Sequence, residues 1–358
     1  MTGHPKTQAK TLLGTLLLGG LLATACASAR ISPPPSPFPP RSRWERPLEV
    51  ALSAPLATDG TLIFTASSTG GVTAIDPATG NTLWTRTGIG PGYVVARPSF
   101  LVAVEKGGVV WGLNVADGSA LWKKATSVSD VQSVRLDGNR VFLGGRSGLA
   151  ALVVSTGELR FDLPATAVRD IDLAGDLVAS VEAGVLVVRN REDGVIRFSL
   201  PSPEGEVGAP ALFADGRIVV GSGSRLGRAI SSSGKFTWRF KVGARVRDRP
   251  LDYLDGKRVG VLSFEGVFYE LSLGGGDMRK RALLASRPFG PPLLSAGRIW
   301  APIFEDEVAA IDPRTTKVVG RARFGGSFLS PPLHVAGRLI AEVTGPRRVV
   351  ALETAPLN

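Results

Sequence analysis

A hairpin-like stretch that recurs at a near-constant spacing is the feature of this sequence that most constrains its fold. Its clearest copy is Val72–Trp84, in which the apolar run VTAI leads into a turn at Gly80 and Trp84 follows four residues later. Glycine suits a tight turn that demands a positive φ, and aromatic and β-branched residues suit the flanking strands. Five copies keep the glycine and an aromatic residue: Gly80 and Trp84, Gly118 and Trp122, Gly157 and Phe161, Gly194 and Phe198, and Gly234 and Trp238.

The spacing of these copies predicts a closed repeat architecture. The five glycines stand 37 to 40 residues apart. Before each hairpin comes a second apolar stretch, such as Pro210–Val220 or Pro250–Val259, which turns at Asp-Gly, a hairpin signal. One period thus predicts four short antiparallel strands, which is one blade of a β-propeller. Since no sustained helical periodicity appears beyond the N-terminus, the sequence predicts an all-β fold.

The two ends of the repeat region complement each other. Residues 44–50 begin with Trp44 and resemble the second half of a hairpin, while residues 349–353 resemble a first half with no strand after it. Pairing the two would close the ring and remove an exposed sheet edge. Residues 44–354 divide into eight periods, so we expect an eight-bladed propeller of four-stranded blades over residues 43–358. We expect Trp44 and the aromatic residues of the repeats to pack blade against blade.

The N-terminal segment predicts export and a lipid anchor. Residues 1–25 combine a basic start with a short apolar run and small residues, which is typical of a secretory signal. Cys26 follows directly in a sequence close to the bacterial lipobox, and it is the only cysteine. We therefore expect lipidation at Cys26, and a proline-rich tether over residues 26–42. Because Ala27 rather than aspartate follows the cysteine, we expect the periplasmic face of the outer membrane.

The composition gives little support for a catalytic site or a metal-binding site. Of the two histidines, only His334 lies after the signal, and we expect it to be a structural residue on an innermost strand. A zinc site needs a cluster of His and Cys residues, and a calcium loop needs closely spaced carboxylates; the sequence offers neither. A Ser-His-Asp arrangement would have to be built on His334 alone. We expect no catalytic residue, no metal and no cofactor.

Arginines gather where the chain crosses from one predicted blade to the next. The formal net charge is +11. Equivalent positions of a repeat fall on one face, so these arginines are expected to converge at one mouth of the central channel and attract anionic partners. The alternative is a solvated rim that Asp170 and Asp248 partly neutralise. Nucleic acid is not an expected partner of an exported lipoprotein. The candidate partner-binding residues are Arg97, Arg169, Arg245, Arg247, Arg249 and Arg287.

The AxDxxTGxxxW pattern of Val72–Trp84 resembles the repeat of the quinoprotein-like (PQQ-repeat) propellers. Within them, the layout of lipobox, tether and eight blades resembles the BamB family of outer-membrane assembly lipoproteins. Quinoprotein dehydrogenases share the repeat. They also resemble one another in carrying adjacent cysteines and calcium ligands, whereas the only cysteine of this chain is Cys26. In the BamB family a crossover loop near mid-chain carries acidic residues that help dock the partner. The matching loop in this chain, Arg245–Arg249, has the opposite charge and is basic.

Three functions follow from this resemblance and from the charge. The first is a non-enzymatic periplasmic scaffold, an accessory that binds a protein partner of the outer-membrane barrel-assembly machinery. The alternative is a binding module for an anionic envelope glycan or lipid, such as lipopolysaccharide, which the arginines would recognise. The third, a quinone-dependent dehydrogenase, is the weakest because its cofactor ligands are missing.

Overall fold

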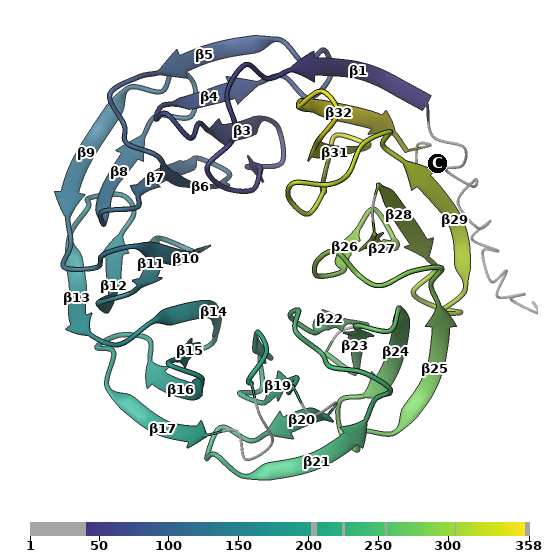
Figure 1. Ribbon diagram of the computed structural model, residues 1–358. Helices are drawn as coiled ribbons and strands as arrows, with labels where there is room; N and C mark the ends of the chain where they lie inside the picture. The colour runs from purple at the N-terminus through teal and green to yellow at the C-terminus, as the bar shows by residue number, and fades with distance from the viewer. Residues whose placement is uncertain (1–40, 202–205, 224–225, 255, 305, 355–358) are drawn as a thin grey trace, which may run out of the picture. The chain divides into compact units, whose positions relative to one another are not determined.

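The protein forms a closed ring of eight four-stranded antiparallel sheets (Figure 1). The computed structural model describes residues 41–201, 206–223, 226–254, 256–304 and 306–354. The all-β, eight-bladed prediction is confirmed, and no helix occurs in these residues. It follows that the described part holds no helix able to span a membrane. Cys26, the signal over residues 1–25 and residues 26–40 of the tether lie outside the described residues.

Each of the first seven blades is one sequence period, and its strands follow one another from the channel to the outer rim (Figure 1). Blades 1 to 4 consist of β2 (Ala57–Thr58), β3 (Ile63–Ala66), β4 (Val72–Ile75) and β5 (Thr82–Arg86); β6 (Gly92–Arg97), β7 (Phe100–Glu105), β8 (Val109–Leu113) and β9 (Ala120–Ala125); β10 (Val131–Asp137), β11 (Arg140–Gly145), β12 (Gly148–Val153) and β13 (Leu159–Pro164); and β14 (Val168–Ala174), β15 (Leu177–Glu182), β16 (Val185–Asn190) and β17 (Ile196–Pro201).

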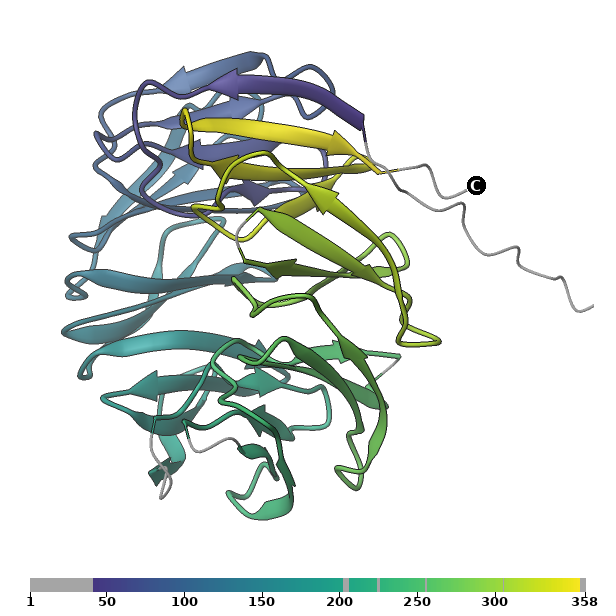
Figure 2. The same ribbon diagram turned by 45° about the vertical axis from the view of Figure 1, so that its right-hand side comes forward.

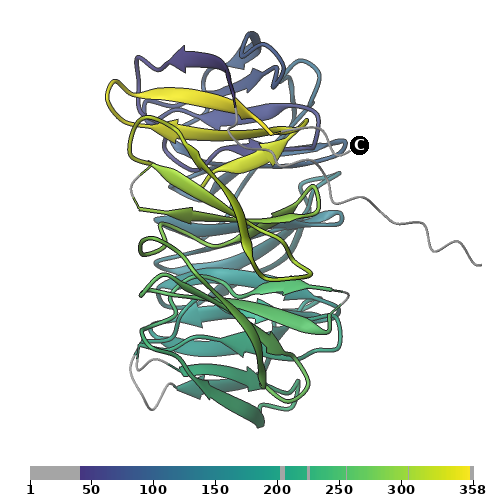
Figure 3. The same ribbon diagram turned by 90° about the vertical axis from the view of Figure 1, so that its right-hand side faces the viewer.

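The remaining blades continue the same order around the ring. Blades 5 to 8 consist of β18 (Ala211–Leu212), β19 (Ile218–Val220), β20 (Leu226–Ile230) and β21 (Phe236–Lys241); β22 (Leu251–Tyr253), β23 (Arg258–Ser263), β24 (Val267–Ser272) and β25 (Met278–Leu283); β26 (Leu293–Ser295), β27 (Arg298–Ile303), β28 (Glu307–Ile311) and β29 (Val318–Arg323); and β30 (Leu333–Val335), β31 (Arg338–Val343), β32 (Arg348–Glu353) and β1 (Arg41–Pro47). In side view, the strands run across the thickness of the propeller (Figures 2 and 3).

The two ends of the repeat region close the ring, as expected. Strand β1 pairs antiparallel with β32, so that Trp44 lies opposite Ala351 and Pro47 opposite Arg348. The paired strand starts at Arg41, earlier than the expected residue 44, and ends at Pro47, after which the Leu48 amide still donates to the Arg347 carbonyl at 3.1 Å. Blade 8 thus draws three strands from the C-terminal end of the chain and one from the N-terminal end. The closure gives blade 8 the same four-stranded form, with one outermost strand, as the other blades.

The repeated aromatic residue packs on the repeated glycine of the next blade. The Trp84 indole nitrogen donates to the Val115 carbonyl at 3.0 Å, and a Cβ on Gly118 would lie 2.6 Å from the Trp84 ring. Gly118 also has a φ of 70°, so it needs both the left-handed conformation and the absent side chain. The same contact joins Trp44 to Gly80, Trp122 to Gly157, Phe161 to Gly194, Phe198 to Gly234 and Trp238 to Gly276.

The junction between blades 6 and 7 keeps the geometry with other residues. At the aromatic position of blade 6, the Lys280 ammonium donates to the Arg314 carbonyl of blade 7, much as the indole nitrogens do elsewhere. At the glycine position of blade 7, Thr316 takes a φ of 57° and its buried hydroxyl donates to Glu270. The junction therefore depends on a hydrogen bond across the seam and on a left-handed residue, and both can be met without Trp and Gly.

Removing the space at one of these glycines should destabilise the ring. Gly118→Ala adds a methyl group against Trp84 at a positive φ, so we expect a loss of about 2–4 kcal/mol in the free energy of unfolding. Gly138→Ala is the matched control, because Gly138 has a φ of 56° but open space around it, and should cost about 1 kcal/mol. Urea unfolding measures both, and equal losses would show that the Trp84 contact contributes nothing.

Candidate functional site

A cavity of about 390 Å³ opens where blades 4 to 7 begin their innermost strands. We call this side of the ring the mouth. Crossover residues ahead of β18, β22 and β26 line the cavity, together with the turns after β23 and β27. Its polar lining is mainly charged and its apolar lining mainly aromatic. The lining includes Arg169, Asp170, Arg245, Arg247, Asp248, Phe264, Phe289 and Phe304.

Arginine and phenylalanine side chains alternate along this cavity. The Arg245 guanidinium lies 4.7 Å from the centre of the Phe264 ring. Arg287, at the edge of the cavity, lies 5.7 Å from Phe264 and 4.3 Å from Phe304. The Phe289 ring follows at 5.8 Å from Phe304. Each exposed arginine–ring contact contributes about 0.5–1 kcal/mol and holds the guanidinium plane while leaving its edge open to a ligand.

Repetition explains why these pairs lie side by side. The Phe264 amide donates to the Arg245 carbonyl at 2.9 Å, and the Phe304 amide donates to the Arg287 carbonyl at 2.9 Å. The two pairs thus hold equivalent positions in blades 6 and 7. The sequence analysis identified the arginines but missed the phenylalanines. Their signal was present, since each directly follows the second apolar strand of its period.

Carboxylates neutralise the blade 4 side of the cavity. Arg169 donates to Asp170 at 2.5 Å and to Glu206 at 3.2 Å, so its charge is already compensated. Burial raises the pKa of Asp248, and nearby Asp170 adds to the shift while Arg247 opposes it. Arg245, Arg247 and Arg287 remain exposed on the other side. The mouth therefore combines a compensated half with a basic half.

Arg249 is a structural clamp, and its side chain is only 20% exposed. Its Nη1 lies 2.8 Å from Asp172, its Nε donates to the Pro210 carbonyl at 3.0 Å, and its Nη2 donates to the Ile171 carbonyl at 2.7 Å. Burial lowers the pKa of Arg249 despite the nearby carboxylates. Burial also lowers the pKa of neighbouring Arg135 to about 10, and Arg249 adds to that shift. The expectation that Arg249 faces a partner is corrected, because its nitrogens serve the junction of blades 4 and 5.

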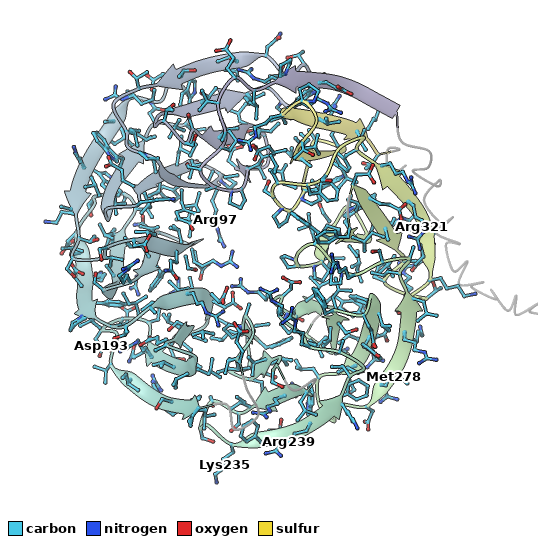
Figure 4. All side chains as sticks on the ribbon, in the orientation of Figure 1. Arg97, Asp193, Lys235, Arg239, Met278 and Arg321 are labelled. Atoms are coloured by element: carbon cyan, nitrogen blue, oxygen red, sulfur yellow. The ribbon has the colours of Figure 1, made fainter. Side chains whose placement is uncertain are left out.

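Arg97 does not join the mouth either. It ends β6, whereas the other arginines precede or begin innermost strands, so it lies at the opposite end of the channel wall. Figure 4 places it on the inner side of the ring. Its guanidinium lies 3.3 Å from Asp137, the last residue of β10. The expected convergence of all six arginines is therefore wrong for Arg97, because the position is the end of a strand and not a crossover.

His334 is held between two hydroxyls on the innermost strand β30. Its Nδ1 lies 3.0 Å from the Ser295 hydroxyl and its Nε2 lies 3.0 Å from the Thr354 hydroxyl. Since Thr354 donates its own proton to the Gly337 carbonyl, Nε2 must be the protonated nitrogen. The ring stacks on Trp300 at 5.8 Å, and burial lowers the pKa of His334. This arrangement joins blades 7 and 8.

Side chains form hydrogen bonds with backbone groups at the edges of several innermost strands. The Ile171 amide donates to the Ser133 hydroxyl at 3.1 Å, and the Ile171 carbonyl accepts from Arg135 at 2.9 Å. The Tyr93 hydroxyl donates to the Gln132 carbonyl at 3.1 Å, and the Leu212 amide donates to Asp172 at 2.8 Å. An extended segment would have to break these bonds to add a strand inside the channel. The free edges for strand addition are those of the outermost strands.

Comparison with known proteins relates this geometry to one family. The family model described as outer membrane protein assembly factor BamB matches residues 40–191. BamB of Xanthomonas campestris pv. campestris is 32% identical over 144 residues, 40% of this chain and 34% of that protein. BamB of Yersinia pestis is 23% identical over 281 residues, 71% of this chain and 62% of that protein. The chain is a BamB-like PQQ-repeat propeller. The matched segments span less than two thirds of either relative's length.

Solved structures share the fold across most of this BamB-like chain. BamB from Moraxella catarrhalis has a TM-score of 0.65 at 15% identity and covers 87% of this chain and 97% of its own. The computationally designed Ika8 protein has a TM-score of 0.71 at 17% identity, over 86% and 100%. Sqt1 of Saccharomyces cerevisiae has 0.68 at 12%, over 88% and 98%. At these identities, the likeness shows the architecture alone.

The BamB-like propeller carries no metal-binding cluster in the residues that the structure describes. The arginine–phenylalanine cavity is the most developed polar site there, and its groups suit binding rather than bond breaking. Exposed guanidinium groups bind carboxylates or phosphates through paired hydrogen bonds. The flanking rings add apolar area, so the site suits an anionic group attached to an apolar body.

The free energy of unfolding should distinguish Arg249 from Arg247, two arginines of the same crossover. Arg249→Met removes the partner of Asp172 and the donors to two buried carbonyls, so we expect a loss of about 2–4 kcal/mol in the free energy of unfolding. Arg247→Met changes an exposed residue of the same crossover and should stay within about 0.5 kcal/mol. Urea unfolding of both variants is the measurement. A comparable loss for Arg247→Met would contradict the assignment of Arg249 as the clamp.

His334 should make the folded state less stable as the pH falls. Its pKa is lowered in the folded state, so near the ordinary histidine pKa of 6.5 the unfolded chain binds a proton that the folded chain does not bind. We expect the free energy of unfolding to fall below about pH 6.5, and His334→Gln to remove that loss. Because Asp248 and Glu342 have raised pKa values and titrate with the opposite sign, the readout is the difference between wild type and variant. Parallel pH profiles would refute the assignment.

Proposed function

We propose that this protein is a non-enzymatic scaffold of the bacterial envelope that assists the assembly of outer-membrane β-barrel proteins. The observation that carries the proposal is the match of residues 40–191 to the BamB family, which starts at the strand that closes the ring. A closed propeller with tight blade junctions offers a partner a fixed set of crossover loops. In this role, the chain positions another protein and performs no reaction of its own.

The proposed location follows from the sequence of the N-terminal segment. Residues 1–25 would direct export, Cys26 would carry the lipid, and residues 26–42 would hold the propeller at the periplasmic face of the outer membrane. The protein partner would be a component of the barrel-assembly machinery. We place its contact at the mouth, on the exposed side chains of Arg245, Arg247 and Arg287. Arg169 would support this contact from the other half of the mouth, where carboxylates neutralise the arginine.

The mouth also supports a second candidate, a binding module for an anionic envelope polymer or lipid. The specific observation is the alternation of Arg245, Phe264, Arg287 and Phe304, which suits phosphate or carboxylate groups next to apolar chains. Lipopolysaccharide and acidic glycans have this chemistry. Contacts made through exposed arginines weaken as ionic strength rises, whereas strand addition at an outer edge does not. Salt dependence therefore separates binding through the arginines, by either kind of partner, from strand addition.

A crosslinked pull-down from detergent-solubilised envelopes tests the proposal. We expect the tagged protein to recover a barrel-assembly protein, and Arg245→Glu with Arg247→Glu to reduce that recovery about tenfold or more, because each reversal places like charges against the partner. The matched control is Lys124→Glu with Arg160→Glu, two exposed residues on the outer strands β9 and β13 that make the same change in net charge.

The outcomes assign the function. Loss of the partner in the Arg245/Arg247 variant alone supports docking at the mouth. Equal recovery from both variants would overturn docking there. Recovery of no assembly protein, with glycan or lipopolysaccharide retained and released by salt, would overturn the scaffold proposal and favour the second candidate.

A further inference from the structure

The outer rim of the propeller is charged unevenly. In blades 5 to 7, the outermost strands and the turns that lead into them contain ten cations and two carboxylates; the same positions of blades 3 and 4 contain three cations and four carboxylates. Figure 4 shows Asp193 on one part of the rim, and Lys235, Arg239 and Arg321 along another. We call the cationic part the basic arc. Its cations are Lys235, Arg239, Lys241, Arg279, Lys280, Arg281, Arg314, Lys317, Arg321 and Arg323.

Little in the described structure neutralises this arc. Arg321 and Arg323 share the single carboxylate of Glu307, at 2.5 and 3.3 Å. Within the described residues, no cation of β21 or β25 forms an ion pair with a carboxylate, and Lys280 donates only to a backbone carbonyl. The arc therefore carries a net positive field toward solvent.

Exposed apolar side chains lie among these cations. Met278 is 48% exposed and Leu283 is 67% exposed at the two ends of β25, and Phe236 is 36% exposed at the start of β21. Figure 4 shows Met278 on the outside of the ring. Cations next to projecting apolar groups are typical of surfaces that bind anionic lipid headgroups, where the charges are attracted to phosphate and the apolar tips enter the interface. The flexible stems of lysine and arginine also adapt to such a surface.

The chain enters the propeller beside this arc. Strand β1 begins at Arg41 on the rim of blade 8, next to β29 of blade 7 (Figures 1 and 2). Cys26, the proposed lipid anchor, lies only fifteen residues earlier in the chain. We propose that the basic arc of blades 5 to 7 rests on anionic phospholipid headgroups of the membrane in which the chain is anchored. This inference depends on the proposed anchoring, but not on the identity of the protein partner.

A fluorescent probe on the full lipidated chain, reconstituted in vesicles, tests the contact. Cys26 is the only cysteine, and the proposed lipid would occupy its thiol, so Met278→Cys can be labelled alone with a polarity-sensitive dye. We expect blue-shifted emission on vesicles of phosphatidylethanolamine and phosphatidylglycerol, none on phosphatidylcholine vesicles, and reversal by salt. The control probe is Leu121→Cys on β9 of blade 2, where the native residue is 66% exposed; its emission should not shift.

Charge removal sharpens the test. Arg279→Ser with Arg281→Ser in the Met278→Cys chain should lower the ratio of lipid-contacting to free propeller about 30-fold. Lys124→Ser with Arg160→Ser, two exposed cations outside the arc, should leave it unchanged. Equal emission from both probes, or no dependence on lipid charge, would overturn the proposal. A chain that does not float with vesicles would instead refute the anchor, so the two failures are distinguishable.

Discussion

The contact between an aromatic ring of one blade and a glycine of the next is the interaction on which this ring depends. A blade is a four-stranded sheet that cannot bury both faces alone, so its stability comes from its neighbours. The Trp84 ring fills the space that Gly118 leaves, and its indole nitrogen satisfies a carbonyl of the turn. Because Trp44 makes the same contact from the last blade to the first, the ring closes with the geometry of its other junctions.

Much of this fold could be predicted because each requirement leaves a residue type at a fixed period. The left-handed turn requires glycine, the junction requires a large ring, and the unmatched strand at Trp44 requires a partner at the other end. The exceptions follow the same physics. Thr316 takes the glycine conformation and Lys280 makes the hydrogen bond of the indole, so the period continues where the motif is lost. The motif alone would have missed that junction between blades 6 and 7.

The site was harder to predict, because its residues are distinguished by the path of the backbone. Arg245, Arg247 and Arg249 alternate along one crossover and look equivalent in sequence. The crossover is not a regular strand, so Arg245 stacks on Phe264 while Arg249 turns inward to Asp172. Local sequence contains no information on which arginine meets a carboxylate from another blade. The aromatic partners were overlooked for a related reason, since a single phenylalanine after a strand is ordinary until repetition places two side by side.

The two basic surfaces of the molecule are at right angles, and this has a mechanical consequence. The mouth looks along the channel axis, whereas the basic arc lies on the circumference (Figure 4). A propeller resting on its rim, as proposed, would hold the channel axis parallel to the membrane, so the mouth around Arg245 and Arg287 would face sideways. Attraction of the rim to lipid then leaves those arginines free for a partner. A ring lying flat would cover one mouth and lose that surface, so under the proposal the uneven rim charge would orient the propeller that the blade junctions make rigid.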